Sequence, residues 1–231
     1  MKALVYKEFK LAMHPICYVF IALFPLMMLV PSYPMGIGFI YLLSCYPILF
    51  LGANKGQQSN DLLYSTLLPV RKKDIVLARI FTVIIMQLAY ILIMAALSPV
   101  AYLIQQNMIA NNPEYAPTGF GVESFVSLIA FAIIGFALAD LIFFPIYYKN
   151  GKSIVMSTLL TILGFVIYLG IFTVALPLIA RSEPSFEWFR VVFSGELWIQ
   201  FIVLGVAIGL SVLAHYLVYK ISSKRLERVD F

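Results

Sequence analysis

Charged residues are scarce in this sequence. They make up 12% of its 231 residues, whereas hydrophobic residues make up 62%. Soluble domains carry about twice that share of charge and only about 45–50% apolar residues. With a mean hydropathy of +0.96, the chain has too little polar surface to cover a globule in water. The composition therefore excludes a water-soluble fold and predicts an all-α, polytopic membrane protein.

Cysteine and histidine are also scarce, with two residues of each. Cys17 and Cys45 lie in apolar stretches, which is typical of packing residues and implies no disulfide framework. His14 and His215 have no spacing with cysteines or acids that suits a metal, so no metal site is predicted. The first 13 residues are charged and patterned, unlike a removable signal peptide.

Long apolar runs fill most of the chain. A helix that crosses about 30 Å of hydrocarbon needs about 20 apolar residues. Six runs are predicted as transmembrane helices, at 15–31, 35–53, 75–104, 124–148, 153–180 and 198–221. Together they form a single transmembrane domain over residues 1–231. The third run is the longest, and we expect its excess length to project on the cytoplasmic side.

The basic residues are distributed unevenly. With both termini inside, fourteen of the sixteen lysines and arginines fall in predicted cytoplasmic segments, and only Arg181 and Arg190 fall in outer loops. Lysine and arginine beside spans are retained in the cytoplasm. The pattern predicts a multi-pass protein of the cell (plasma) membrane with both termini cytoplasmic. The net charge of +5 is thus a topological signal and argues against a nucleic-acid partner.

Residues 2–13 show an apolar stripe at helical spacing. The stripe consists of Val5, Phe9, Ala12 and Met13, and Lys7, Glu8 and Lys10 lie off it. This pattern predicts an N-terminal interfacial helix on the inner side of the membrane. A charged lead-in to the first span is an equal alternative.

The loop at 54–74 is the longest predicted cytoplasmic segment. Ser59, Asn60 or Asp61 can cap a short helix there, and Pro69 ends it. This helix carries apolar side chains at i, i+4 spacing, namely Leu63, Tyr64, Leu67 and Leu68. Because these apolar side chains would otherwise be exposed to water, we expect a partner surface to cover them. The alternative is that they dip into the interface of the chain's own membrane.

Asp140 is the only acid well inside a predicted span. Acids within membranes are costly and usually paired. His215 and Arg79 are the candidate partners, and we name Asp140 with His215 as a candidate intramembrane polar pair. Such a pair is either a gate or proton site, or an interhelical hydrogen bond.

The last outer loop, 181–197, predicts an amphipathic helix. Phe186, Phe189 and Phe193 recur at i, i+3 and i+7. The helix would rest on the outer interface, either as a lid or as an anchor. In the following span, Gly205 and Gly209 would let another helix approach closely, which is weak support for a dimer.

Three stretches resemble the permeases of ATP-binding-cassette (ABC) type-2 exporters. They are Leu67-Leu-Pro-Val-Arg-Lys-Lys-Asp-Ile-Val-Leu-Ala-Arg79, the opening Met1-Lys-Ala-Leu-Val-Tyr-Lys-Glu8, which is similar to the family's elbow helix, and Phe144-Pro-Ile-Tyr-Tyr-Lys-Asn-Gly151, which is similar to its inner turn. The resemblance covers the whole chain. It is closest to the small permeases of phenol-soluble modulin exporters, which more often have an aromatic residue where this chain has Asn150.

The resemblance implies a cytoplasmic coupling helix that binds a separate ATPase subunit. The residues concerned are Asp61, Leu62, Leu63, Tyr64, Leu67, Leu68, Pro69 and Arg71. It also implies a second permease chain, identical or closely related. No cofactor is expected in this chain, because ATP and magnesium would bind the partner. The triplet at 151–153 resembles the end of a phosphate loop, but position 146 is isoleucine rather than glycine.

The spans offer aromatic residues and methionine but almost no charge. Such walls suit amphipathic peptides or lipid-like molecules and disfavour ions or sugars. We expect a non-catalytic permease subunit of an ATP-driven exporter that moves amphipathic or antimicrobial peptides, in contact with membrane lipid. The alternatives are a lipid or hydrophobic-drug exporter permease and a membrane-embedded immunity or regulatory protein without transport. An intramembrane enzyme would need more than the single acid Asp140.

Overall fold

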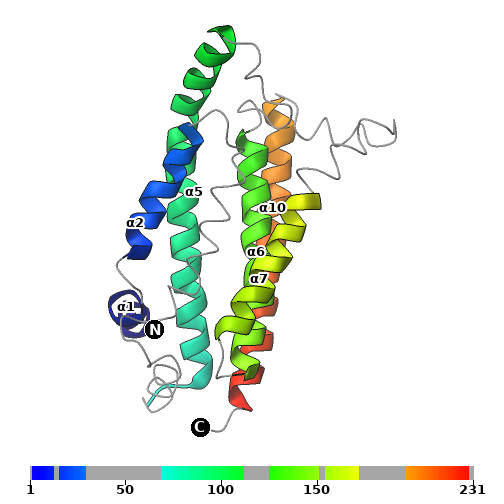
Figure 1. Cartoon of the computed structure of the whole chain (residues 1–231). Coiled ribbons are helices and arrows are strands. Elements are labelled where there is room, and N and C mark those ends of the chain that lie inside the picture. Colours follow the sequence, from blue (N-terminus) through cyan, green and yellow to red (C-terminus); the bar gives the residue numbers. More distant parts are fainter. Residues whose placement is uncertain are drawn as a thin grey trace, which may run out of the picture.

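A computed structural model describes six stretches of the chain: residues 2–12, 16–29, 69–111, 125–150, 154–171 and 196–228. All regular structure within them is helical, as the composition predicts (Figure 1). The long helices are α5 (Lys72–Asn111), α6 (Phe125–Asn150), α7 (Ile154–Gly170) and α10 (Leu197–Glu227). The short ones are α1 (Lys2–Lys7) with its π-helical continuation η1 (Glu8–Ala12), and α2 (Ile16–Leu23) with the 3-10 helix η2 (Phe24–Leu29).

Three of the described helices, α5, α6 and α10, are long and apolar enough to cross a membrane. They coincide with the predicted third, fourth and sixth spans. In the fifth, the described helix α7 is shorter, with 17 residues. In the first, helix α2 gives way to the tighter η2 near Pro25, whose missing N–H interrupts α-helical hydrogen bonding. The predicted span at 35–53 lies outside the described residues, so six spans stay a prediction.

Helix α5 is longer than its apolar run. It has 40 residues and therefore measures about 60 Å, twice the hydrocarbon thickness. Its C-terminal end extends beyond α6 and α10, away from the basic start of the helix (Figure 1). Which end of α5 projects from the membrane stays a prediction. Polar residues after Ile104 end the apolar run, but they do not break a helix. The first strong breaker after this point is Pro113, which disfavours helix in the residue before it.

Helix α6 is the most buried of the candidate spans. In its most apolar window 67% of the residues are buried, against 11% in α10. Its buried aromatic residues fill the core between α5, α7 and α10; they are Phe131, Phe136, Phe143, Phe144, Tyr147 and Tyr148. Helix α7 packs closely at Gly135, where a Cβ atom would lie 2.8 Å from the Phe165 ring. The remaining face of α10 is exposed and apolar, as expected of a surface in contact with lipid.

The basic residues of the described helices gather at one end of the bundle. Helix α5 starts there, α6 and α10 end there, and α1 lies beside them (Figure 1). We call this the basic end. Its residues include Lys2, Lys7, Lys10, Arg71, Lys72, Lys73, Lys149, Lys220, Lys224 and Arg225. The gathering is what a one-sided charge distribution requires, and which side of the membrane it faces stays a prediction.

The N-terminal segment is helical, as its periodicity predicts. For one of its side chains, however, the sequence pattern predicted the wrong face of the helix. The pattern put Glu8 on the polar face, and the structure buries it. Leu4 and Glu8 are four residues apart and share the face that packs on α5. A buried arginine on α5 attracts the carboxylate inward, and this attraction overrides the apolar stripe. Whether α1 lies in a membrane interface stays a prediction.

Candidate functional site

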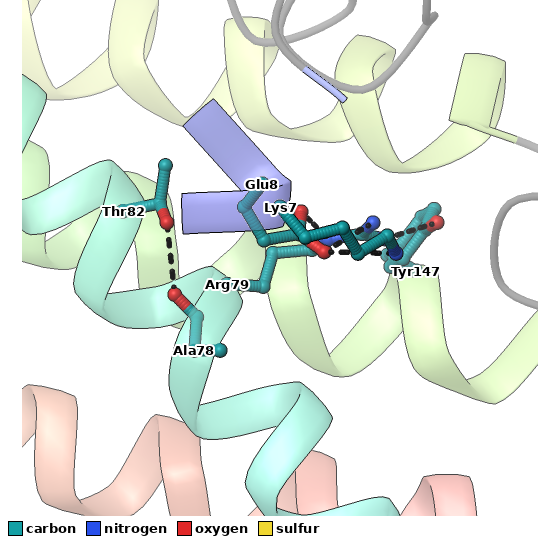
Figure 2. A network of polar contacts seen from close by, with 6 residues as sticks. All are labelled: Lys7, Glu8, Ala78, Arg79, Thr82 and Tyr147. Atoms are coloured by element: carbon teal, nitrogen blue, oxygen red, sulfur yellow. Dashed lines mark hydrogen bonds and ion pairs between the residues drawn. The ribbon is translucent and has the colours of Figure 1, made fainter. Parts of the chain in front are cut away.

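A buried ion pair joins the N-terminal helix to the bundle at its basic end (Figure 2). Arg79 of α5 donates from Nε to Oε2 of Glu8 at 2.9 Å and from Nη2 to Oε1 at 3.3 Å. Its third nitrogen, Nη1, donates to the hydroxyl oxygen of Tyr147 on α6 at 3.0 Å. We call Glu8, Arg79 and Tyr147 the junction, because these residues connect η1, α5 and α6.

The junction is withdrawn from solvent. The side chains of Arg79 and Glu8 are 2% and 5% exposed. A guanidinium presents its donors as a planar fork, which matches the two oxygens of one carboxylate. Lys7 adds a contact to Glu8, with Nζ 3.4 Å from Oε1. Because an unpaired charge at this depth would cost several kcal/mol, Glu8 and Arg79 must stay together for the helices to pack as they do.

Two further polar contacts hold the basic end. Lys73 at the start of α5 lies 3.3 Å from Glu227 at the end of α10, measured from Nζ to Oε1. Arg225 of α10 donates from Nη1 to the carbonyl oxygen of Pro145 in α6. The starts and ends of α5, α6 and α10 are therefore connected by side chains as well as by apolar packing.

The predicted coupling helix lies mostly outside the described residues, and so do the predicted outer-helix residues Phe186, Phe189 and Phe193. Asp61, Leu62, Leu63, Tyr64, Leu67 and Leu68 belong to the undescribed stretch before residue 69. Pro69 and Arg71 are described, and both are exposed. The carbonyl oxygen of Arg71 accepts from the backbone N–H of Asp74 at 2.9 Å, and its Nε lies 3.4 Å from Oδ2 of that residue. The predicted coupling segment thus leads into α5 within a few residues.

A second buried polar site lies further along α5 and α6. Asp140 of α6 is fully buried, and its Oδ2 lies 3.1 Å from Nε2 of His215 on α10. Gln87 of α5 donates from Nε2 to the same oxygen at 3.0 Å. The structure therefore brings together the two residues named from the sequence. It excludes Arg79 as the partner of Asp140, because that arginine binds Glu8 two turns away along α5.

A pocket adjoins this polar site. It has a volume of about 360 Å³ and is lined by residues of α5 and α10 and by Ile133 and Phe136 of α6. Apolar side chains line most of it, and the polar groups of Gln87, Ser211 and His215 meet at its wall. An apolar pocket with a few convergent polar groups is typical of sites for small or amphipathic ligands. Within the described residues, no group of three potential metal-binding side chains occurs.

The model of the family described as "ABC-2 family transporter protein" matches residues 3–223, nearly the whole chain. This chain belongs to the ABC-2 transporter family. It is therefore a membrane permease subunit of an ABC transporter, a type of subunit that works with an ATPase partner and is typically non-catalytic. No curated protein and no solved structure matches the chain.

Sequence reasoning missed the junction of this ABC-2 permease and the role of Gln87. A signal for the junction was present, because Arg79 lies inside an apolar run where a lone cation needs a partner. The sequence pattern instead placed Arg79 among the basic residues of the inner side and made it a candidate partner of Asp140. An uncharged amide such as Gln87 gives no comparable signal, because an interhelical amide and a lipid-facing one look alike in sequence.

Proposed function

We propose that this permease is part of an ATP-driven exporter that moves amphipathic or antimicrobial peptides out of the cell. The observation that carries the choice of cargo is the pocket between α5, α6 and α10. Its apolar wall accepts apolar side chains, whereas ions and sugars would lose their water there without replacement. Its polar groups at one point of the wall suit a molecule with one apolar and one polar face. The resemblance to phenol-soluble modulin exporters favours peptides over lipids.

The proposal assigns the energy input to the coupling segment. In it, Asp61–Leu68 form a helix that seats in the ATPase subunit, where ATP and magnesium bind. The connection to α5 supports this assignment, because only Pro69, Val70 and Arg71 separate the segment from the first turn of the helix. A displacement of the segment would therefore reach Arg79, and with it the junction, along a continuous helix.

The proposal also includes a second permease chain, identical or closely related, and both termini in the cytoplasm. Gly205 and Gly209 of α10 support the pairing, because a Cβ atom at either would meet nothing within 4 Å among the residues that the structure describes. Small residues on an open membrane-facing surface let a further helix approach. A helix at Phe186–Phe193 would then cover the outer exit, with membrane lipid around the assembly.

The cargo is tested by reconstituting the permease with its ATPase in lipid. We expect amphipathic helical peptides to stimulate ATP hydrolysis and to cross-link to the spans, whereas scrambled peptides without an apolar face do neither. Equal responses to both peptide sets would reject the peptide-exporter proposal. Stimulation by lipids alone would favour the alternative of a lipid exporter.

The coupling segment is tested separately by co-purification with the ATPase. Replacing Leu67→Asp and Leu68→Asp places charge in an apolar contact, and we expect the complex to be lost while the permease itself stays folded. Val70→Asp is the matched control, because Val70 is exposed and follows the residue that ends the predicted helix. Retention of the complex by the double variant would contradict the assignment.

A further inference from the structure

The site around Asp140 constrains the protons that it holds. Nδ1 of His215 lies 2.7 Å from the carbonyl oxygen of Ser211, one turn earlier on α10. A carbonyl oxygen can only accept a hydrogen bond, so Nδ1 must carry a proton. The other ring nitrogen, Nε2, faces Oδ2 of Asp140 at 3.1 Å.

Two arrangements satisfy this geometry. In the first, Asp140 is ionised, Nε2 of His215 donates to it, and the ring is an imidazolium. In the second, Asp140 is a carboxylic acid that donates to an unprotonated Nε2, and the ring is neutral. The arrangements differ only in which side of the 3.1 Å contact holds the proton. In both, the pair carries no net charge and holds one proton between its two members.

We propose that Asp140 and His215 form an intramembrane proton-binding site that stabilises the contact of α6 with α10 only while it holds one shared proton. A second proton would leave a buried imidazolium beside a neutral acid. Loss of the shared proton would leave a buried carboxylate beside a neutral ring. Either state gives the pair a net charge between packed helices, which is costly in a medium of low dielectric constant.

The groups around the pair fit this role. Gln87 of α5 and Ser211 of α10 both contact it, and neither changes charge. Besides the pair itself, the charged and titratable side chains of the helices packed around it are Lys72, Lys73, Asp74, Arg79, Tyr90 and Tyr102 on α5, Tyr147, Tyr148 and Lys149 on α6, Tyr168 on α7, and Tyr216, Tyr219, Lys220, Lys224, Arg225 and Glu227 on α10. Of these, Arg79 is neutralised by Glu8, eight residues or about 12 Å along α5 from Gln87.

The consequence is mechanical as well as chemical. Helix α10 makes most of its contacts with α6, and little of its apolar window is buried. A charge that appears at Asp140 or His215 therefore acts on the main surface that holds α10. Gln87 extends the effect to α5, because its amide donates to the same carboxylate oxygen. The proton occupancy of the pair would thus set how tightly three helices pack at one level.

The first test is the thermal unfolding of the purified full-length permease across pH, without an ATPase. We expect wild-type stability to pass through a plateau and to fall at both lower and higher pH. Asp140→Asn should keep only the acid-side fall, because a lone ring can still become charged. His215→Gln should keep only the alkaline-side fall, because a lone carboxyl group can still ionise. The double variant should lose both.

The size of each fall is set by proton linkage. A difference of one bound proton changes the unfolding equilibrium tenfold per pH unit. Stability differences from the double variant isolate this site from the rest of the chain. Parallel profiles for the wild type and the single variants would overturn the proposal. Because no cargo or partner is involved, the outcome is independent of the peptide-export proposal.

A second test needs no variant at the site and so covers the case in which the variants do not fold. The chain has only two histidines, so permease with ¹⁵N-labelled histidine gives two ring signals, and His14→Gln assigns them. We expect Nδ1 of His215 to stay protonated at every pH at which the protein is folded, while the signal of Nε2 reports the shared proton. An unprotonated Nδ1, or a ring that titrates as an exposed histidine does, would refute the shared-proton site.

Discussion

The buried ion pair at the junction gives the sharpest prediction for stability. Glu8→Gln keeps the shape of the side chain but removes the negative charge that binds the cation of Arg79, whose side chain is 2% exposed. Removing one member of a buried pair costs about 3–5 kcal/mol. Arg79 keeps its bond to Tyr147 and can still donate to the one amide oxygen, so we expect the lower end, about 3 kcal/mol. At about 2–4 °C per kcal/mol for a chain of this size, the melting temperature should fall by about 6–12 °C.

The assay is thermal unfolding of the purified permease, followed by tryptophan fluorescence. Lys73→Gln is the matched control, because its pair with Glu227 lies at the same end of the bundle but is 53% and 46% exposed. Exposed pairs contribute only about 0.2–1 kcal/mol, so this variant should lose no more than about 4 °C.

A further variant separates the unpaired charge from the lost contact. Glu8→Leu combined with Arg79→Met removes both charges, and an apolar replacement of a buried pair is often neutral or stabilising. We therefore expect the double variant to recover most of the lost stability. The reasoning fails if Glu8→Gln melts within the range of the Lys73→Gln control, or if the double variant is no more stable than the single one.

Two other predictions follow from packing and topology. Gly135→Ala should destabilise the permease by about 1–3 kcal/mol in a melt, because its Cβ would lie 2.8 Å from the buried Phe165 ring. Gly170→Ala should be neutral, because a Cβ atom there would meet nothing within 4 Å among the described residues. Single cysteines placed at the exposed Asn111 and Lys224 should react with impermeant reagents from opposite sides of the membrane, the first from outside; labelling of both from one side would refute the predicted orientation.

The sequence predicted the parts of the fold that depend on composition and on isolated charges. Apolar runs located α5, α6 and α10 because a membrane requires about 20 such residues in one helix. A single acid in a span predicted a partner for Asp140, and His215 was one of two candidates. The sequence could not choose between His215 and Arg79, because the choice depends on whether Arg79 is already paired with another acid.

Other features depend on distances that sequence patterns do not contain. The burial of Glu8 follows from a contact with Arg79, 71 residues away, and not from the periodicity of a short helix. The full length of α5 follows from where a breaker occurs and not from where the apolar run ends. The predicted coupling helix and outer helix lie outside the described residues, so the roles of Leu67 and Phe189 stay predictions.

The two polar sites share one geometric feature that bears on how the permease works. Arg79 and Gln87 are eight residues apart on α5, and their partners Tyr147 and Asp140 are seven residues apart on α6. Because α5 and α6 run in opposite directions, both contacts are compatible with one and the same register of α5 against α6 (Figure 1). In the proposed mechanism, a displacement of the start of α5 would reach the contact of Arg79 first. About 12 Å further along the helix it would reach the Asp140 site, whose proton occupancy we propose to set the packing of α10 on α6.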